Sequence, residues 1–247
     1  MAARRDVYNG WGGWDGENGA IWSDFRMEEF EKVRLEFEEK LPNEMLRLAE
    51  GFYEKMKNRR SVRDFSERFV PREIIEDCVR AGGTAPSGAN CQPWHFVVVS
   101  EADVKRRIHV EAERIEAAFY AKESNRQWIE DLKHLGTKVE KPFLEQAPYL
   151  IVVFSQTYGL TPDGKKTNHY YVHQSVGIAV GFLIAAIHNA GLACVPYTPA
   201  PATFLNKILG RPENERAFCV LPVGYPAAGA HVPDIEKKSF EEICTLL

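Results

Sequence analysis

The segment 170–189 constrains the fold most, because it is apolar on almost every side and carries small residues throughout. Gly177, Ala179 and Gly181 lie along it, and Gly191 follows shortly after its end. A helix without a polar face belongs in the interior of a domain, and small side chains let neighbouring elements approach closely. The sequence therefore predicts a central helix, packed by its neighbours and ended at Gly191.

Short β-branched and aromatic runs predict buried strands. These runs cover 94–100, 149–155, 192–198 and 217–225. Helical spacing of apolar residues predicts helices at 27–39, 42–56, 71–83, 101–121 and 204–209, and Pro42 and Pro71 stand in first turns, where proline is tolerated. This mixture indicates an α+β fold in which helices surround a modest sheet.

We predict one domain over 26–247, preceded by an arm over 1–25. The arm is rich in glycine and aromatic residues and has no helical or strand period, as in a segment that packs onto another surface. Residues 122–147 carry charges and isolated aromatic residues without a clean period, so we expect irregular or lid-like structure there. Residues 161–166 predict a turn.

Charge and cysteine content exclude several classes of protein. The formal net charge is −4, whereas nucleic-acid and membrane-surface binding usually call for a broad basic face. The five cysteines are scattered and form no CxxC pair, which indicates neither a disulfide framework nor a thiolate metal site. The first residues hold no apolar leader or anchor, and no run is long and charge-free enough to predict a membrane span. We expect a soluble, cytoplasmic protein.

Three arginines are concentrated in the stretch RRSVRDFS, residues 59–66. In an extended segment Arg59, Ser61 and Arg63 would point to one side and Arg60 to the other. Forked guanidinium groups beside a hydroxyl make a suitable cradle for a phosphate. The alternative is a solvated basic run after a helix C-terminus, where cations are favoured in any case. Spacing alone leaves both interpretations open.

Other motifs carry less chemical information. The loop APSGANCQPW contains Ser87 and Gly88, but no GxSxG elbow supports a serine nucleophile. Gly88 would let backbone approach a flat ligand, although the loop also suits an ordinary turn. His169 and His173 have helical metal-ligand spacing, yet no HExxH pattern accompanies them, so we predict no metal site. GxGxxG and P-loop motifs are both missing.

Taken in order, RRSVRDFS, APSGANCQPWHFVVVS, GKKTNHYYVHQSVGIAVGFLIAAIHNAGL, YTP, LGRPENE and LPVGYP resemble the flavin-dependent nitroreductase superfamily. The stretch EAAFY…RQWIEDLKHLGTKVEKPFL is similar to the lid of the iodotyrosine deiodinases within it. The resemblance covers roughly residues 45–243. It implies a nitroreductase-like fold with a mostly antiparallel sheet, an FMN cofactor, and an intertwined homodimer with the flavin at the subunit interface.

The resemblance also implies roles for particular residues. Arg59, Arg60, Ser61 and Arg63 match the FMN-binding arginine motif, so the expected anion is the FMN phosphate. Pro86, Ser87, Gly88 and Ala89 match the loop beside the flavin, with the Ala89 amide placed to meet a substrate phenolate. Thr198 matches the threonine that hydrogen-bonds flavin N5. Lys237 falls where the family has a further phosphate-binding arginine; lysine keeps the charge but loses the fork.

Glu116, Tyr120 and Lys141 match the three substrate-binding residues of the deiodinase lid, which would span about 113–145. A free amino acid presents an ammonium and a carboxylate, and desolvating both requires complementary partners. Glu116 could take the ammonium, while Lys141 and the Tyr120 hydroxyl could take the carboxylate. Glu116 and Tyr120 share a helix face by their i,i+4 spacing. The alternative interpretation is a routine surface pair and an unrelated lysine.

The expected function is FMN-dependent reductive dehalogenation of halotyrosines, with electrons from NAD(P)H directly or through a reductase. A general NAD(P)H-dependent nitroreductase or quinone reductase is the alternative enzyme, because it needs the arginine and APSGA motifs but makes no use of the lid residues. A flavin-binding protein without turnover is a third possibility. Animal members of the family carry an N-terminal membrane anchor, whereas this chain begins with the aromatic and glycine-rich arm.

Overall fold

The computed structural model describes residues 32–247, in two compact units divided between Met45 and Leu46. The predicted helix 27–39 is wrong over its described part, since residues 32–41 are not helical and α1 begins only at Pro42 (Pro42–Lys57). Val33 and Phe37 remain exposed. A short amphipathic segment whose apolar face packs on nothing has little to stabilise a helix. The predicted arm, 1–25, lies outside the described residues, and the boundaries proposed for the domain stay a prediction.

The larger unit, Leu46–Leu247, is built on a four-stranded sheet with the order β1-β2-β6-β5. All three pairings are antiparallel, as expected for the predicted fold class. The predicted strand over 192–198 is mostly wrong, because regular pairing stops after Cys194 and Tyr197 makes only an isolated bridge to Val220. Pro196 and Pro199 lack the N–H that a ladder needs. The strands are β1 (Trp94–Val99), β2 (Tyr149–Gln156), β5 (Ala193–Cys194) and β6 (Glu215–Gly224).

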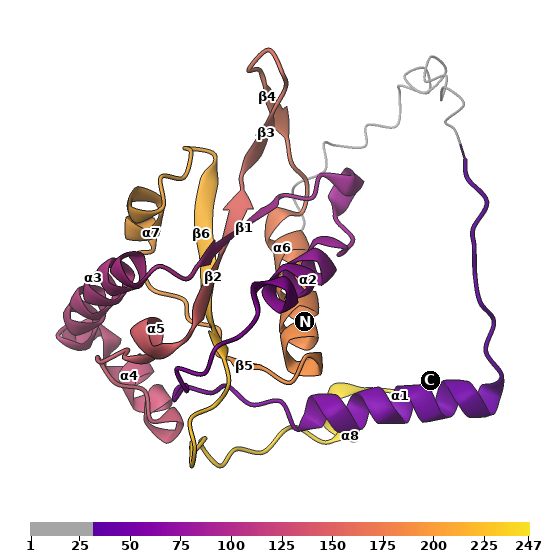
Figure 1. Cartoon of the computed structure of the whole chain (residues 1–247), viewed down its shortest axis with the longest axis horizontal. Helices are drawn as coiled ribbons and strands as arrows, with labels where there is room; N and C mark the ends of the chain where they lie inside the picture. Colours follow the sequence, from indigo (N-terminus) through magenta and orange to yellow (C-terminus); the bar gives the residue numbers. More distant parts are fainter. Residues whose placement is uncertain (1–31) are drawn as a thin grey trace, which may run out of the picture. The chain divides into compact units, whose positions relative to one another are not determined.

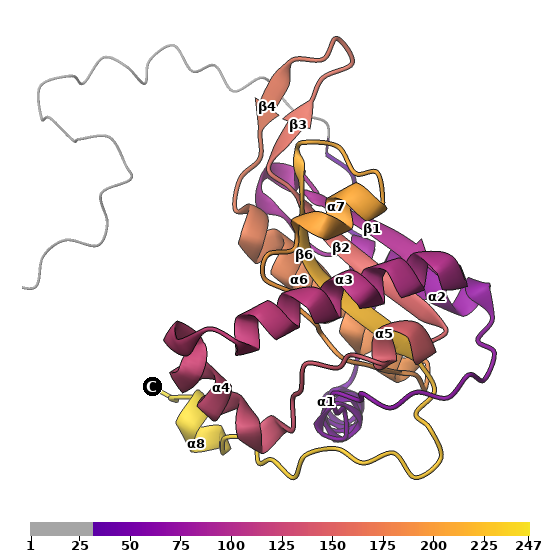
Figure 2. The same cartoon turned by 90° about the vertical axis from the view of Figure 1, so that its left-hand side faces the viewer.

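Helices cover both faces of this sheet (Figure 1, Figure 2). Along β2, Leu150, Val152 and Phe154 point into one hydrophobic cluster, while Ile151 and Val153 point into another. This alternation follows from the two-residue period of a strand. Because both faces are buried, β2 has an almost continuous apolar sequence. One face carries α2 (Arg72–Gly83) and α6 (Val172–Asn189), and the other carries α3 (Ala102–Tyr120), α5 (Phe143–Gln146) and α7 (Thr203–Ile208).

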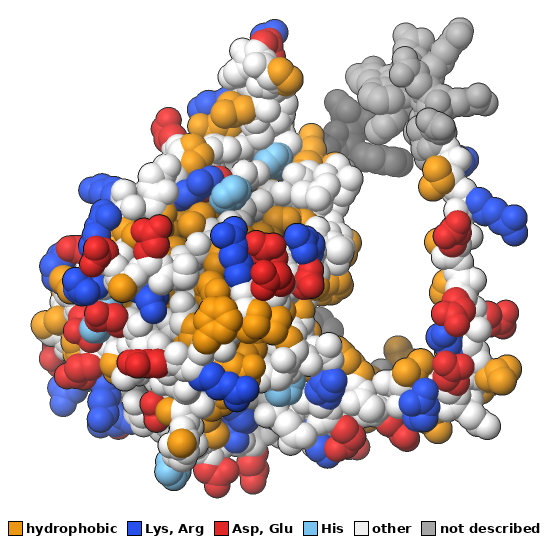
Figure 3. Space-filling model, viewed as in Figure 1, with side chains coloured by type: hydrophobic (Ala, Val, Ile, Leu, Met, Phe, Trp, Pro, Cys, Tyr) orange, Lys and Arg blue, Asp and Glu red, His pale blue; other side chains and the backbone are white. Residues whose placement is uncertain are grey.

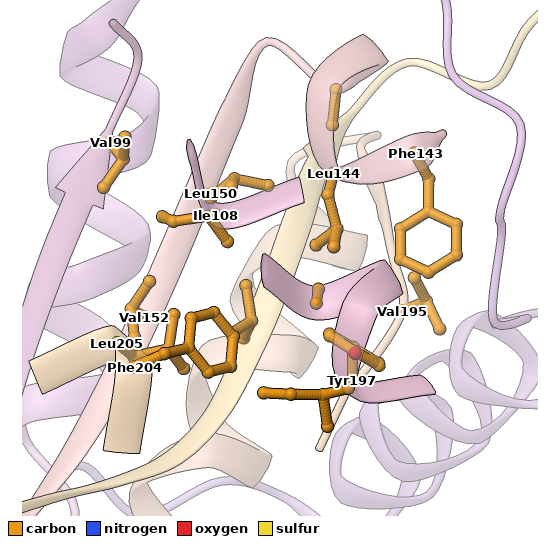
Figure 4. Packing of buried hydrophobic residues seen from close by; sticks show 14 of the residues in the cluster. Val99, Ile108, Phe143, Leu144, Leu150, Val152, Val195, Tyr197, Phe204 and Leu205 are labelled. Atoms are coloured by element: carbon orange, nitrogen blue, oxygen red, sulfur yellow. The ribbon is translucent and has the colours of Figure 1, made fainter. Parts of the chain in front are cut away.

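The cluster beneath α3, α5 and α7 fixes the elements that line the candidate site. Figure 4 shows Ile108 of α3, Leu144 of α5 and Leu205 of α7 gathered around Leu150 and Val152 of β2. All five side chains are fully buried. Burying an aliphatic side chain of this size stabilises the folded state by about 1.5–3 kcal/mol. The sheet therefore holds α3 and the segment before β2 rigidly beside the strip that follows β5.

The central helix α6 packs in one chain on only one side. Val176, Leu183 and Ile187 are buried against α2 and the sheet, whereas Ile178 and Phe182 are exposed. The prediction of a helix surrounded by neighbours is thus confirmed for one face, and it stays a prediction for the face that is exposed in one chain. Figure 3 shows hydrophobic side chains reaching the surface among charged ones on the face that it draws.

By length and composition, α6 would also pass as a membrane span, so the prediction that no segment has those properties is wrong. Core helices of soluble proteins pass the same test, and α6 contributes to the hydrophobic core.

The remaining connections are more ordered than the sequence suggests. Within 122–147 the structure has short helices over 123–135 and 143–146, whereas 136–142 is irregular as predicted. The turn predicted at 161–166 joins a two-stranded hairpin that the sequence analysis missed. Both hairpin strands have only three residues, which is too short for a strand period to be recognised. These elements are η2 (Glu123–Asn125), α4 (Arg126–Leu132), η3 (Lys133–Leu135), β3 (Tyr158–Leu160) and β4 (Lys166–Asn168), with η1 (Gly88–Asn90) and α8 (Phe240–Ile243) elsewhere.

Candidate active site

A cavity of about 690 Å³ lies between the C-terminal half of α3, the segment from α4 to α5 and the strip 195–200. Glu116, Tyr120 and Lys141 all line it, as do Arg63 and Thr198. The structure therefore brings together five of the predicted site residues. Glu116 and Tyr120 project from the same face of α3, as their i,i+4 spacing predicts, and Lys141 lies two residues before the start of α5.

The centre of this site is an ion pair between Glu116 and Lys141. Lys141 Nζ lies 3.1 Å from Glu116 Oε2, and the two side chains are only 7% and 16% exposed respectively. Removing one partner of such a desolvated pair strongly destabilises the folded protein, because the remaining buried charge then has no partner. Lys141 Nζ also donates hydrogen bonds to the carbonyls of Lys138 and Val139.

Tyr120 occupies the same end of the cavity. Its hydroxyl donates a hydrogen bond to Thr137 Oγ1 at 3.2 Å, and Lys141 Nζ lies 6.0 Å from the centre of its ring. The site thus presents a carboxylate, an ammonium and a phenol hydroxyl within one concave region. Such a set is complementary to a ligand that carries both an ammonium and a carboxylate.

Tyr197 is a site residue that the sequence analysis missed. Its buried hydroxyl donates a hydrogen bond to Glu116 Oε1 at 3.1 Å. Burial, reinforced by the nearby charge of Glu116, raises the pKa of this phenol well above its usual value, so it stays a neutral donor. The only signal in the sequence is that Tyr197 precedes Thr198, which identifies neither its burial nor its partner.

Aromatic side chains form an apolar wall of the cavity. Phe119 and Trp128 meet edge to face with ring centres 5.3 Å apart, and Phe143 meets Tyr197 similarly at 6.0 Å. All four line the cavity. Aromatic walls of this kind favour a flat, aromatic ligand over an aliphatic one.

The basic segment 59–63 is extended and lies beside β5. Ser61 forms an isolated parallel bridge with Cys194, and the Val62 N–H donates to the Cys194 carbonyl at 3.3 Å. Arg59 and Arg60 line a second cavity of about 220 Å³, whereas Arg63 lines the larger one. The three arginines are therefore not gathered around one cavity in a single chain, and the predicted alternation of their side chains stays a prediction. Arg60 donates a hydrogen bond to the Pro233 carbonyl.

Of the three arginines in this segment, Arg63 is the best candidate for binding an anion. It is half-buried, and burial lowers the pKa of its guanidinium. Within residues 32–247 its side chain has no hydrogen bond or ion pair. A partly desolvated guanidinium without a carboxylate fits a site for a phosphate or another small anion.

The loop 86–89 lies apart from the cavity in a single chain. A Cβ on Gly88 would come within 2.8 Å of the Tyr170 carbonyl, so only glycine allows this loop to pack against the start of α6. Ala89 has a φ of 49°, a left-handed conformation that costs energy for a residue with a Cβ. Ser87 Oγ accepts a hydrogen bond from the Gln92 N–H at 2.9 Å. Neither cavity is lined by this loop or by the exposed Lys237.

The two histidines with helical spacing have other partners. His169 Nδ1 lies 2.9 Å from the Gln156 carbonyl, and His173 meets the Phe218 ring edge to face. Among residues 32–247 there is no group of three or more His, Cys, Asp or Glu side chains that could hold a metal ion.

A chain of charged groups behind the cavity anchors Lys141. Its backbone N–H donates to Glu113 Oε1 at 2.7 Å, and His109 lies between Glu113 (Nε2, 2.7 Å) and Glu145 (Nδ1, 2.8 Å). Arg106 Nε lies 3.5 Å from Glu145 Oε1. Burial opposes ionisation of Glu113, but hydrogen bonds from Lys141 and His109 outweigh it and hold its pKa below the usual value. This arrangement fixes the backbone that carries Lys141.

Replacing Glu113 by Gln should therefore lower stability in a pH-dependent way. A carboxyl group whose pKa is lower in the folded state than in the unfolded state stabilises the fold fully at a pH above its unfolded-state pKa, which is about 4.3 for Glu. This stabilisation is lost as the pH falls through the folded-state pKa. We expect the Glu113→Gln variant to be about 1 kcal/mol less stable at pH 7, with a difference that shrinks as the pH falls below the unfolded-state pKa of about 4.3. Urea unfolding across this range measures it. Glu111→Gln, on the same helix, is the control, and a difference independent of pH would contradict the anchoring role.

Comparisons with known proteins show what the chain as a whole is similar to. The model of the nitroreductase family matches residues 56–225. An iodotyrosine deiodinase from Haliscomenobacter hydrossis is 54% identical over 197 residues, which cover 80% of this chain and 89% of that protein. Iodotyrosine deiodinase 1 from Homo sapiens is 45% identical over 201 residues, covering 81% and 70% of the two chains.

Solved structures give the same picture. A crystal structure of oxidised iodotyrosine deiodinase bound to FMN and 3-iodo-L-tyrosine superposes with a TM-score of 0.66 at 31% identity, and covers 79% of this chain and all (100%) of that one. A BluB-like flavoprotein from Clostridium difficile 630 has a TM-score of 0.59 at 23% identity, with 79% and 98% covered, which supports the fold alone.

Proposed function

The chain belongs to the nitroreductase family, and we propose that within this family it is an FMN-dependent enzyme that removes halogen reductively from halotyrosines. The observation that carries the proposal is the cavity in which Glu116, Tyr120 and Lys141 face one another beside Arg63 and Thr198. The overall reaction replaces a carbon–halogen bond by a carbon–hydrogen bond and releases halide. Each turnover consumes two electrons and one proton.

The residues present fit FMN. Arg63 is a half-buried cation without an ion-pair partner in residues 32–247, and the adjacent Arg59 and Arg60 add two more guanidinium groups. We assign the FMN phosphate to Arg59, Arg60, Ser61 and Arg63, with Lys237 as a further charge. When bound, FMN supplies the electrons that no amino acid side chain of the site can provide. The Thr198 hydroxyl, which has no hydrogen-bond partner in the described chain, is assigned to flavin N5.

The lid residues bind the amino acid end of the substrate. Glu116 takes the ammonium, while Lys141 and the Tyr120 hydroxyl take the carboxylate. The aromatic wall of Phe119 and Trp128 encloses the ring and excludes water, which strengthens these charged contacts. The Ala89 amide would bind the substrate oxygen as phenolate, with Pro86, Ser87 and Gly88 shaping the loop beside the flavin.

Two copies of the chain are needed for this assignment. In one chain the loop 86–89 does not line the cavity that holds Glu116 and Lys141, so a second copy would supply it. The exposed face of α6 supports such a homodimer, because Gly177, Ile178, Gly181 and Phe182 form an apolar strip on it. The small residues allow a second helix to approach closely, and burying the strip removes apolar surface from water.

We further propose NAD(P)H, directly or through a reductase, as the electron donor. A cytoplasmic location is consistent with the five cysteines, all of which are free and three of which are buried.

Titration of the oxidised, FMN-loaded protein tests the substrate assignment. Binding of an aromatic ligand against the flavin is expected to quench its fluorescence. We expect 3-iodotyrosine to bind in the micromolar range and more tightly than 4-nitrophenol, because only the amino acid engages Glu116 and Lys141. Quenching by the nitroaromatic alone would favour a general nitroreductase instead.

A further inference from the structure

The carboxylate of Glu116 is held from two sides. Tyr197 donates to Oε1 and Lys141 pairs with Oε2, both at 3.1 Å. The two contacts differ in kind, since one is a hydrogen bond from a neutral phenol and the other is an ion pair. Each oxygen of the carboxylate therefore has its own partner within the chain.

Tyr197 is the fixed member of this arrangement. Its backbone exchanges two hydrogen bonds with Val220 of β6, at 2.9 and 2.8 Å, and its ring packs in the core against Phe143. Figure 4 shows the ring in that cluster, near Val195 and Phe143. Glu116, in contrast, has three rotatable side-chain bonds, so holding it in one rotamer costs conformational entropy that its contacts must offset. The hydroxyl therefore selects one orientation of the carboxylate.

A zwitterionic ligand can enter this site by exchanging ion pairs. Its ammonium can replace Lys141 at Glu116 Oε2, while the released Lys141 ammonium pairs with the ligand carboxylate. The single ion pair of the site becomes two ion pairs, so the exchange leaves no buried charge alone. The exchange requires that Glu116 Oε1 keep its hydrogen bond from Tyr197. Without that hydrogen bond the carboxylate could rotate, and both of its oxygens could pair with Lys141.

We propose that Tyr197 is a positioning residue for substrate binding, which holds Glu116 Oε1 so that Oε2 is available to the substrate ammonium. This inference rests on the proposed function, because it names the device by which the same site recognises the amino group. Tyr197 itself does not contact the substrate in this proposal.

The test is the Tyr197→Phe variant of the FMN-loaded full chain, titrated with two ligands. One is 3-iodotyrosine, and the other is 3-(4-hydroxy-3-iodophenyl)propanoate, which keeps the ring and the carboxylate but lacks the ammonium. We expect the dissociation constant of 3-iodotyrosine to rise about tenfold, equivalent to about 1.4 kcal/mol, and that of the second ligand to change less than about twofold. A merely structural role would weaken both ligands alike.

Tyr149→Phe is the matched control. It also removes a buried hydroxyl, which donates to the Val70 carbonyl at 3.2 Å on the opposite side of the sheet. Its ratio of the two dissociation constants should equal that of the wild type. Tyr197→Met fills similar volume without a hydroxyl and should reproduce the change of ratio seen with Phe. Because both ligands are titrated into the same sample, partial loss of folded protein does not alter the ratio.

Two results would overturn the inference: an unchanged ratio in both Tyr197 variants, or a Tyr197→Phe effect that persists fully when Glu116 is already Gln. The proposed function fails in a different way. If the wild type binds the ligand without ammonium as tightly as 3-iodotyrosine, Glu116 does not recognise an amino group and no Tyr197 variant is needed to reject the assignment.

Discussion

A Glu116→Gln variant is expected to bind 3-iodotyrosine about a hundredfold more weakly than the wild type, equivalent to about 2.7 kcal/mol, while its reduction of nitroaromatics is unchanged. The substitution keeps the size of the side chain but removes its charge. In the complex the ligand ammonium then has no carboxylate partner, in a site where the Glu116 side chain is only 16% exposed. Unpaired charge in such surroundings is strongly unfavourable. Flavin-fluorescence titration and steady-state nitroreductase rates measure the two effects.

Glu140→Gln is the control for this prediction. Glu140 lines the same cavity but is exposed, so the substitution changes the charge of the cavity equally without breaking the pair with Lys141. Its effect on affinity should stay below about threefold, since exposed ion pairs contribute little. Equal losses in the two variants would mean that the cavity attracts the ligand only by net charge.

A Gly181→Glu variant is expected to be monomeric and to lose bound FMN. A Cβ at Gly181 meets no atom within 4 Å, so the single subunit tolerates the side chain, and glutamate favours a helix more than glycine does. In the proposed dimer the same carboxylate would be buried in an apolar contact between two copies of α6, which is strongly unfavourable without a partner. Light scattering coupled to size-exclusion chromatography measures the mass, and the flavin absorbance of the purified protein measures occupancy.

Val110→Glu is the control for this variant. It introduces the same charge at an exposed apolar position, on α3 instead of α6. It should leave the dimer and its FMN intact. A Gly181→Glu protein that remains dimeric with full flavin would place the subunit contact elsewhere.

The buried strands and most helices could be predicted from the sequence because the pattern of apolar residues along each of them matches the faces that the fold buries. The run predicted at 149–155 becomes β2 (Tyr149–Gln156), since both of its faces are covered and the sequence is apolar throughout. Where local pattern and packing disagree, the prediction fails. Residues 32–39 have helical spacing but their large apolar side chains are exposed and no helix forms, and the strip after Cys194 has apolar residues but prolines in place of ladder donors.

The site was predictable only in part. Helical spacing places Glu116 and Tyr120 on one face, but nothing in the spacing connects them with Lys141, which reaches them because the segment 126–141 folds back across the cavity. Tyr197 gives no signal of its own, because its role depends on a bridge to β6 that pattern does not reveal. The separation of the loop 86–89 from this cavity is likewise a matter of tertiary arrangement, and it is the reason that a second copy enters the proposal.

The most direct test of the account is a single turnover under anaerobic conditions. The FMN of the purified protein is reduced with dithionite, excess reductant is removed, and 3-iodotyrosine is added. We predict one tyrosine and one iodide per flavin, with return of the oxidised flavin spectrum. A flavin that stays reduced with 3-iodotyrosine and reoxidises only when a nitroaromatic is added would contradict the assignment of the substrate.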